Sequence, residues 1–191
     1  MDTKKRVGIG IAALAVAVLA IGLGTFAAFN DTETGPGGAT AAGTLDLTVG
    51  STNASQLFGQ ANIAPGFSQQ VGVTLHNAGS LPGTLTSKLT ASTADVSCTE
   101  PEQEAEGGTT CAAAGNLQDQ MTVQVISAPG VTAPQAAVPW KTFVANGLPA
   151  AGVVPAGGDA AYQLLFALPA SADNKVQGDS VTLTSAFTLA Q

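Results

Sequence analysis

The stretch VTLTSAFTL, residues 181–189, alternates apolar and polar side chains over most of its length. Because successive side chains of a β-strand point to opposite faces, its apolar members fall on one side of an extended chain. Similar alternation recurs at residues 44–49, 71–75, 85–89, 121–125 and 162–168. Turn-forming pairs separate the runs, for example Pro65-Gly66, Pro82-Gly83 and Gly157-Gly158. Short strands with turns between them predict an all-β fold, an antiparallel β-sandwich.

One segment has a different period. Between Ala112 and Met121, the side chains of Ala113, Leu117 and Met121 recur at a spacing of four residues. This spacing places them on one face of a helix, so a short helix is expected here.

The composition bounds the chemistry that the chain can perform. Its 191 residues carry a formal net charge of -7, and 45% of them are apolar, which is enough to build the core of one ordinary domain. The 6 basic residues cluster only at residues 4–6, which excludes a basic nucleic-acid-binding surface. With one histidine and two cysteines, the chain has little material for metal or nucleophile chemistry.

The N-terminus has the layout of a secretory signal peptide. A positive cluster at residues 4–6 precedes an uncharged run over residues 7–29, near the end of which stand the small residues Ala27 and Ala28. We therefore expect cleavage between Ala28 and Phe29. The alternative is a retained membrane anchor, because an uncharged run of this length is long enough to span a bilayer.

These features divide the chain into three parts. We expect a signal peptide over residues 1–28, an N-terminal arm over residues 29–43, and a β-sandwich domain over residues 44–191. The Gly/Pro break GPGG at residues 35–38 is typical of a mobile linker and lies inside the arm.

Several short motifs occur in order from the signal peptide to the last expected strand. GTFAAFND at residues 24–31 is followed by AGTLDL at residues 42–47, and further blocks stand at residues 65–66, 77–81 and 177–180. Together they resemble the TasA and camelysin family. The resemblance implies a jelly-roll-like β-sandwich, export through a SipW-type signal peptidase, and a place in the extracellular matrix or at the cell surface.

The same resemblance implies how the chain assembles and what its partners are. Fibre-forming members of this family build biofilm matrix by donating an N-terminal strand to a neighbouring copy. Head-to-tail homopolymers are therefore expected, with Phe29, Asn30, Asp31 and Thr32 as assembly residues. A minor matrix or anchor protein is a further expected partner, and nucleic acid is not. Camelysin members are instead described as surface metallo-endopeptidases, and a monomeric surface adhesin is the third reading.

The sequence does not support the protease alternative. Zinc hydrolases use several ligands and a general base, often as H-E-x-x-H on a helix, whereas His76 is followed by Asn77 and has no second histidine as companion. No GxSxG elbow occurs, and no helper for His76 is visible, so a Ser-His-Asp triad is not indicated either. We expect His76 to be an edge-strand residue near solvent. No catalytic residue, cofactor-binding residue or metal ligand is expected.

Cys98 and Cys111 are expected to form a disulfide, because the pair fits neither CxxC chemistry nor a four-ligand zinc site and exported cysteines are commonly paired. Four glutamates lie between them, which leaves a calcium loop and a stapled, solvated surface loop as alternatives. The ligand order of an EF-hand is missing, so the surface loop is favoured. Asp179, after Gly178, is expected to be a turn residue, and Asp46 a solvent-facing strand residue.

Overall fold

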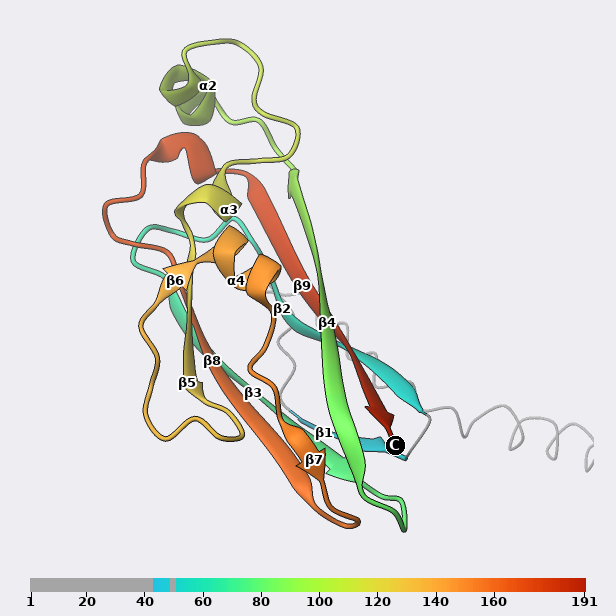
Figure 1. Ribbon diagram of the computed structural model, residues 1–191. Helices are drawn as coiled ribbons and strands as arrows, with labels where there is room; N and C mark the ends of the chain where they lie inside the picture. The colour runs from blue at the N-terminus through green and yellow to red at the C-terminus, as the bar shows by residue number, and fades with distance from the viewer. Residues whose placement is uncertain (1–42, 49–50) are drawn as a thin grey trace, which may run out of the picture. The chain divides into compact units, whose positions relative to one another are not determined.

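The computed structural model describes residues 43–48 and 51–191, in which two β-sheets pack face to face (Figure 1). The first sheet has the strand order β1 (Gly43–Leu47), β3 (Ser68–Asn77), β8 (Asp159–Ala167), β5 (Thr122–Ser127) and β6 (Val138–Pro139). The second sheet has the order β2 (Thr52–Ala61), β9 (Asp179–Ala190), β4 (Gly83–Asp95) and β7 (Gly152–Val154). The all-β sandwich expected from the alternating runs is confirmed.

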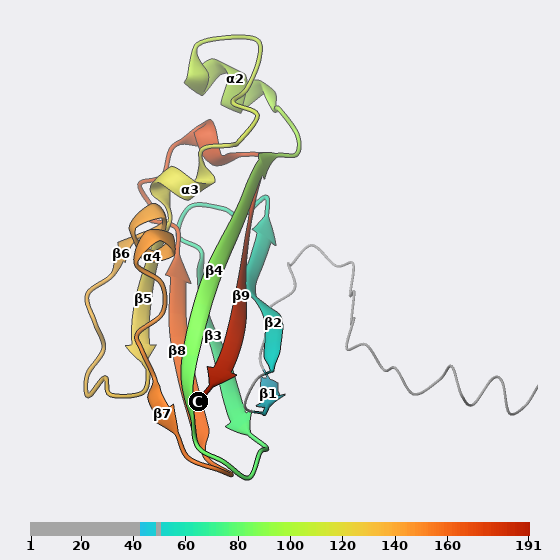
Figure 2. The same ribbon diagram turned by 45° about the vertical axis from the view of Figure 1, so that its right-hand side comes forward.

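Neighbouring strands run antiparallel except at one edge of the first sheet. There β1 pairs with β3 in parallel, from Gly43 opposite Val73 to Leu47 opposite Asn77. The turn of Figure 2 brings β1 and β2 forward, at the side of the sandwich where both sheets have an edge.

The inner faces of the two sheets share one hydrophobic core. At its centre the ring of Phe58 stacks on that of Phe166, with centroids 4.2 Å apart. The indole of Trp140 lies 6.1 Å from each of these rings, so three segments distant in sequence meet here. Aromatic groups of this size dominate the apolar area that such a core removes from water.

Each alternating run overlaps a strand, but β2 has no such pattern. A bulge between Gln56 and Phe58 shifts its register against β9, and residues 57–60 are buried in succession. The extra residue of a bulge breaks the alternation on which the sequence prediction depends. Strands β6 and β7 are too short to show a period.

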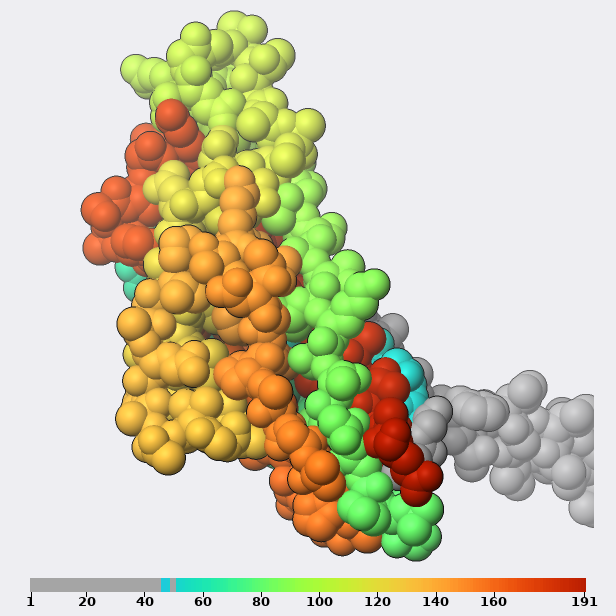
Figure 3. Space-filling model, viewed as in Figure 1, coloured from blue at the N-terminus to red at the C-terminus, as the bar shows by residue number. Residues whose placement is uncertain are grey.

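Three short helical segments gather at one end of the sandwich, where β4 ends and β9 begins (Figure 1). They are α2 (Glu100–Glu106), α3 (Leu117–Gln120) and the 3-10 turn η1 (Asn174–Val176). We call this region the capped end; a further helix, α4 (Trp140–Asn146), packs beside α3. In the space-filling view, the segments of α2 and η1 adjoin there (Figure 3).

The capped end corrects two expectations. The segment between the two cysteines is not a loop alone, because α2 occupies its first half. The helix expected over residues 112–121 is shorter than its apolar spacing suggested and begins only at Leu117. Ala113 is exposed, and Gly115 has a positive φ of 67°, which a helix does not allow.

At the opposite end of β4, the chain turns between β3 and β4 and between β7 and β8. Asn77, the last residue of β3, is 1% exposed and lies between these two turns. We call this region the hairpin end. Among the residues that the structure describes, no helix is long and apolar enough to cross a membrane.

Candidate functional site

Strand β1 covers only part of the edge of β3. Its five residues lie opposite Val73 to Asn77, while residues 68–72 of β3 pair with β8 alone among the described strands. Leu47 of β1 is buried and its backbone oxygen accepts a hydrogen bond from Ala78 N–H at 2.8 Å, so β1 is attached to its own domain. Along residues 68–72, this edge of β3 has no partner among the described strands, so its backbone groups could pair with a further strand. Asp46 is exposed on β1, as expected.

His76 has an acidic partner, contrary to expectation. The register of β3 and β8 places Asp159 directly opposite, and the histidine Nδ1 lies 2.6 Å from Asp159 Oδ1. The expectation that His76 has no acidic partner is therefore wrong. The sequence did not reveal the partner because Asp159 lies 83 residues away along the chain. His76 is also not on an edge strand, since β1 covers that part of β3. Both side chains are substantially exposed, at 35% and 60%, which is typical of a surface pair.

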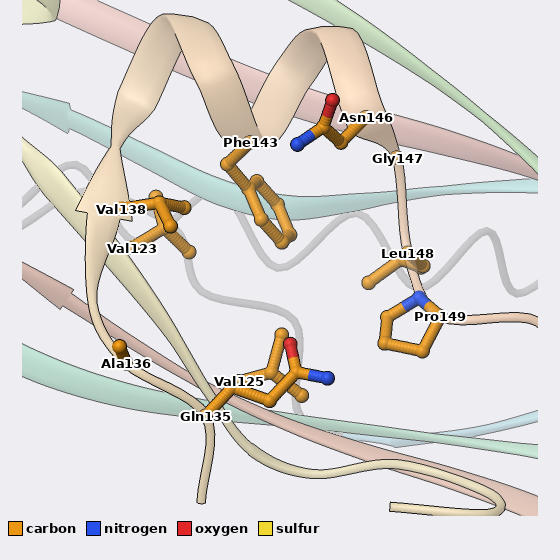
Figure 4. Close-up of a pocket in the computed structure, with 10 residues that line it drawn as sticks. All are labelled: Val123, Val125, Gln135, Ala136, Val138, Phe143, Asn146, Gly147, Leu148 and Pro149. Atoms are coloured by element: carbon orange, nitrogen blue, oxygen red, sulfur yellow. The ribbon is translucent and has the colours of Figure 1, made fainter.

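An apolar groove lies between β5 of the first sheet and the segment that leads from α4 to β7 (Figure 4). Its volume is about 290 Å³. Phe143 and Leu148 line it opposite Val123 and Val125, and no charged side chain contributes to its lining. The groove therefore offers apolar contact without groups for acid–base or metal chemistry.

The two cysteines are joined at the capped end. Cys98 and Cys111 form a disulfide with their Cα atoms 5.5 Å apart, and α2 lies within the closed loop. The helix begins after Thr99, whose N–H donates to Glu102 Oε2 at 3.3 Å. The sequence T-E-P-E at residues 99–102 is a helix-start signal, since a threonine at the N-cap, an early proline and a glutamate at the third helical position favour this turn.

Three carboxylates converge under α2: Asp95, Glu102 and Asp179. Asp95 ends β4 and stands directly opposite Asp179, the first residue of β9. Glu102 reaches them from α2, and one oxygen of each residue lies within 4.8 Å of the others. Glu102 and Asp179 are both 0% exposed, while Asp95 is half-buried. Asp179 is thus not the turn residue expected from its place after Gly178, and Glu102 is not part of a solvated loop.

Backbone N–H groups hold one oxygen of each carboxylate. Asp179 Oδ2 accepts hydrogen bonds from Asn116 N–H at 2.6 Å and Leu117 N–H at 2.9 Å. Asp95 Oδ1 accepts from Ser97 N–H at 2.9 Å. The second oxygens of the two buried residues, Glu102 Oε1 and Asp179 Oδ1, have no hydrogen-bond partner. Buried polar atoms are rarely left in this state, because an unpartnered group keeps the full cost of its desolvation.

Two glycines allow the backbone to close around Asp179. A Cβ on Gly115 would lie 2.4 Å from Asp179 Oδ1, and a Cβ on Gly178 would lie 1.9 Å from the backbone oxygen of Ser97. Both residues have positive φ, at 67° and 85°, a region that glycine adopts readily. Gly115 therefore lets the backbone lie directly against the Asp179 carboxylate, and Gly178 lets the chain just before Asp179 pass close to Ser97.

The electrostatics of the cluster disfavour three bare charges. Burial raises the pKa of Glu102 and of Asp179 above their ordinary values. The neighbouring charges of Asp95 and Glu106 raise both pKa values further, whereas the backbone hydrogen bonds lower them. Among the described residues the ion pairs are Lys141 with Asp119 and His76 with Asp159, so no cation pairs with the cluster.

Sequence reasoning missed this cluster because its members are far apart in the chain. Asp95 and Asp179 meet only through the pairing of β4 with β9, which no local pattern reveals. The capping signal at residues 99–102 would have placed Glu102 on a helix. The signal cleavage site at Ala28 and Phe29 and the assembly residues 29–32 lie outside the described residues.

A family model described as Camelysin metallo-endopeptidase matches residues 2–110, more than half of the chain. No curated protein matches the chain.

Proposed function

The chain belongs to the camelysin family, and from this premise we propose that it is a secreted structural protein that polymerises into extracellular fibres. Each subunit would donate its N-terminal arm, residues 29–43, as a strand to a neighbouring copy. Membership of this family is consistent with a surface or extracellular location. The observation that carries the proposal is the parallel pairing of β1 with only half of the edge of β3.

The register of β1 on β3 specifies where the arm would add. Each residue of β1 pairs with the residue thirty positions later, from Gly43 with Val73 to Leu47 with Asn77. Continued toward the N-terminus, the same register sets residues 38–42 opposite residues 68–72, the part of β3 that has β8 as its only described neighbour. Addition of a strand to such an edge supplies main-chain hydrogen bonds and fixes direction.

The same contacts serve within one copy or between two. An arm that continues β1 on its own β3 gives a closed monomer, and an arm that, together with β1, takes the same register on the β3 of the next copy would give an open chain of subunits. Exchange of an identical element between copies changes few contacts, so it is a low-cost route to assembly. The Gly/Pro break at residues 35–38 precedes most of the segment at residues 38–42 and would set the angle at which the first residues of the arm leave it.

The residues of this chain do not fit the catalytic metal that the family name implies. The only histidine, His76, pairs with Asp159 on the outer face of the first sheet. The three-carboxylate cluster contains oxygen donors only, whereas catalytic zinc sites use histidine or cysteine with carboxylates and keep an open position. We therefore derive no proteolytic step for this protein.

A pair of engineered cysteines tests the proposed register. In a parallel ladder the backbones lie about 5 Å apart, so Thr40→Cys and Gln70→Cys would stand within disulfide range. Oxidation of assembled double variant is expected to give a ladder of covalent multimers on a non-reducing gel. The matched control combines Thr40→Cys with Thr86→Cys, an exposed position on the second sheet, and is expected to give no ladder.

A deletion of the arm, and the behaviour of the wild-type protein, provide further tests of strand donation. Deletion of residues 29–42, which removes the whole segment that the register sets opposite residues 68–72, should leave a folded monomer that forms no filaments in negative-stain electron microscopy. Filaments of undiminished length from that deletion, or equal ladders from both cysteine pairs, would contradict strand donation at this edge. A wild-type protein that stays monomeric under all conditions would instead support a monomeric adhesin, and chelator-sensitive cleavage of casein would support the protease alternative.

A further inference from the structure

The cluster at the capped end has geometry that the proposed function does not use. We propose that Asp95, Glu102 and Asp179 bind one calcium ion, which ties α2 to the ends of β4 and β9. The proposal is independent of how the arm assembles, since none of the three residues belongs to the arm or to the edge of β3.

The spacing of the oxygens suits an ion of this size. Calcium binds its oxygen ligands at about 2.4 Å, so any two ligands of one ion lie at most about 4.8 Å apart. One oxygen from each of the three carboxylates meets this limit with respect to the other two. They come from β4, α2 and β9, so a single ion would join three separate elements.

The free oxygens supply the second, independent observation. Glu102 Oε1 and Asp179 Oδ1 are fully buried and have no hydrogen-bond partner, although the other oxygen of each residue is held by backbone N–H groups. Each carboxylate is therefore oriented by the backbone and has one acceptor left over. A bound cation would satisfy both acceptors at once and neutralise charges that no lysine, arginine or histidine among the described residues pairs with.

The donor chemistry selects the kind of ion. Carboxylate oxygens without nitrogen or sulfur favour hard cations. Calcium accepts irregular coordination with six to eight oxygens, whereas magnesium requires a near-ideal octahedron at about 2.0–2.1 Å and retains several waters. Asp95 is only half-buried, so the cluster has a side through which an ion and its water ligands can approach.

The rival to a bound cation is a shared proton. Adjacent carboxyl groups can remain buried if one or more of them are neutral, as in acid pairs that hold a proton between them. Such a cluster would bind no ion near neutral pH, so direct binding measurements distinguish the two.

The test is calcium titration of the full secreted protein by isothermal calorimetry at pH 7.5, after removal of divalent ions with a chelator. We expect saturable binding of one calcium ion per chain at concentrations below about 1 mM, the range of extracellular calcium modules, and magnesium binding at least about tenfold weaker. Asp179→Asn and Glu102→Gln should each weaken calcium binding by about tenfold or more. Glu104→Gln, an exposed position on the same helix, is the matched control and should leave the affinity within about twofold.

A measurement on the wild-type protein alone can overturn the proposal, so the test does not depend on whether a variant folds. Absence of saturable calcium binding to the wild-type protein below 1 mM would contradict it and would support the shared proton. Equal affinity for magnesium would contradict the assignment to calcium. Binding that the two cluster variants retain, while near-ultraviolet circular dichroism shows them folded, would place the ion elsewhere.

Discussion

Asn77 and Asp179 are both almost completely buried polar residues, and they lie at opposite ends of the two sheets. At the hairpin end, the Asn77 amide nitrogen donates to the backbone oxygens of Leu81, Val154 and Pro155 at 2.9, 3.2 and 3.1 Å. Its side-chain oxygen accepts from Gly79 N–H at 3.0 Å. One neutral side chain therefore joins the β3–β4 turn to the β7–β8 turn.

At the capped end, three acidic side chains occupy the corresponding position, and two of their buried oxygens lack partners. The difference shows what a buried polar group needs. A neutral amide can satisfy itself with backbone groups, so the hairpin end is complete without any ligand. A cluster of carboxylates has acceptors only, so the capped end is complete only with a cation or with protons.

The largest expected effect on the free energy of unfolding is at the hairpin end. Asn77→Ala removes the four hydrogen bonds of the side chain and leaves backbone groups unpaired in a buried position. We expect the free energy of unfolding to fall by about 3 kcal/mol, measured by urea denaturation, and by the same amount with calcium or with chelator. The control is Asn146→Ala, at the exposed end of α4, which should change it by less than about 0.5 kcal/mol. A loss for Asn77→Ala that depends on calcium would remove the contrast between the ends.

The second expected effect is a dependence of stability on pH that arises at the capped end. In calcium-free protein the pKa values of Glu102 and Asp179 are raised, mainly by burial, so the folded state holds these protons more tightly than the unfolded chain does. Their contribution to stability is then full below the ordinary pKa values of 4.5 and 3.8 and is lost as the pH rises through the raised values. Each unit of difference corresponds to about 1.4 kcal/mol.

Urea denaturation in chelator between pH 4 and pH 8 measures this slope. The double variant Glu102→Gln with Asp179→Asn should lack the wild-type fall in unfolding free energy, because neither replacement titrates. Saturating calcium should also abolish the fall in the wild type, since the ion binds the deprotonated carboxylates. Identical pH profiles for wild type and double variant would mean that the cluster does not titrate with folding.

The smallest expected effect concerns the exposed pair of His76 and Asp159. Because both side chains are open to solvent, His76→Ala should change the free energy of unfolding by less than about 1 kcal/mol. The variant should form filaments and bind calcium like the wild type. A double-mutant cycle with Asp159→Ala isolates the pair, and a coupling energy well above this bound would show that the histidine has a larger role than a surface contact.

The features that the sequence predicted best are the strands with a regular local alternation of apolar and polar residues. Alternation located the long strands β3, β8 and β9, because one face of each is buried and the other is not. The bulge in β2 removed that period, and the acidic character of α2 suggested a loop although its N-cap residues favour a helix. The cluster itself was out of reach, since the opposition of Asp95 and Asp179 follows from strand pairing across 84 residues.

The two ends of the sandwich differ most directly if the capped end needs a cation for its order and the hairpin end does not. Hydrogen–deuterium exchange of the purified protein, with calcium and with chelator at pH 7.5, measures both ends in one experiment. We expect calcium to slow exchange by about tenfold or more in peptides covering residues 95–117 and 173–179, and to leave residues 77–83 and 154–159 unchanged. Equal exchange at the capped end in both conditions, or equal slowing at both ends, would contradict the account.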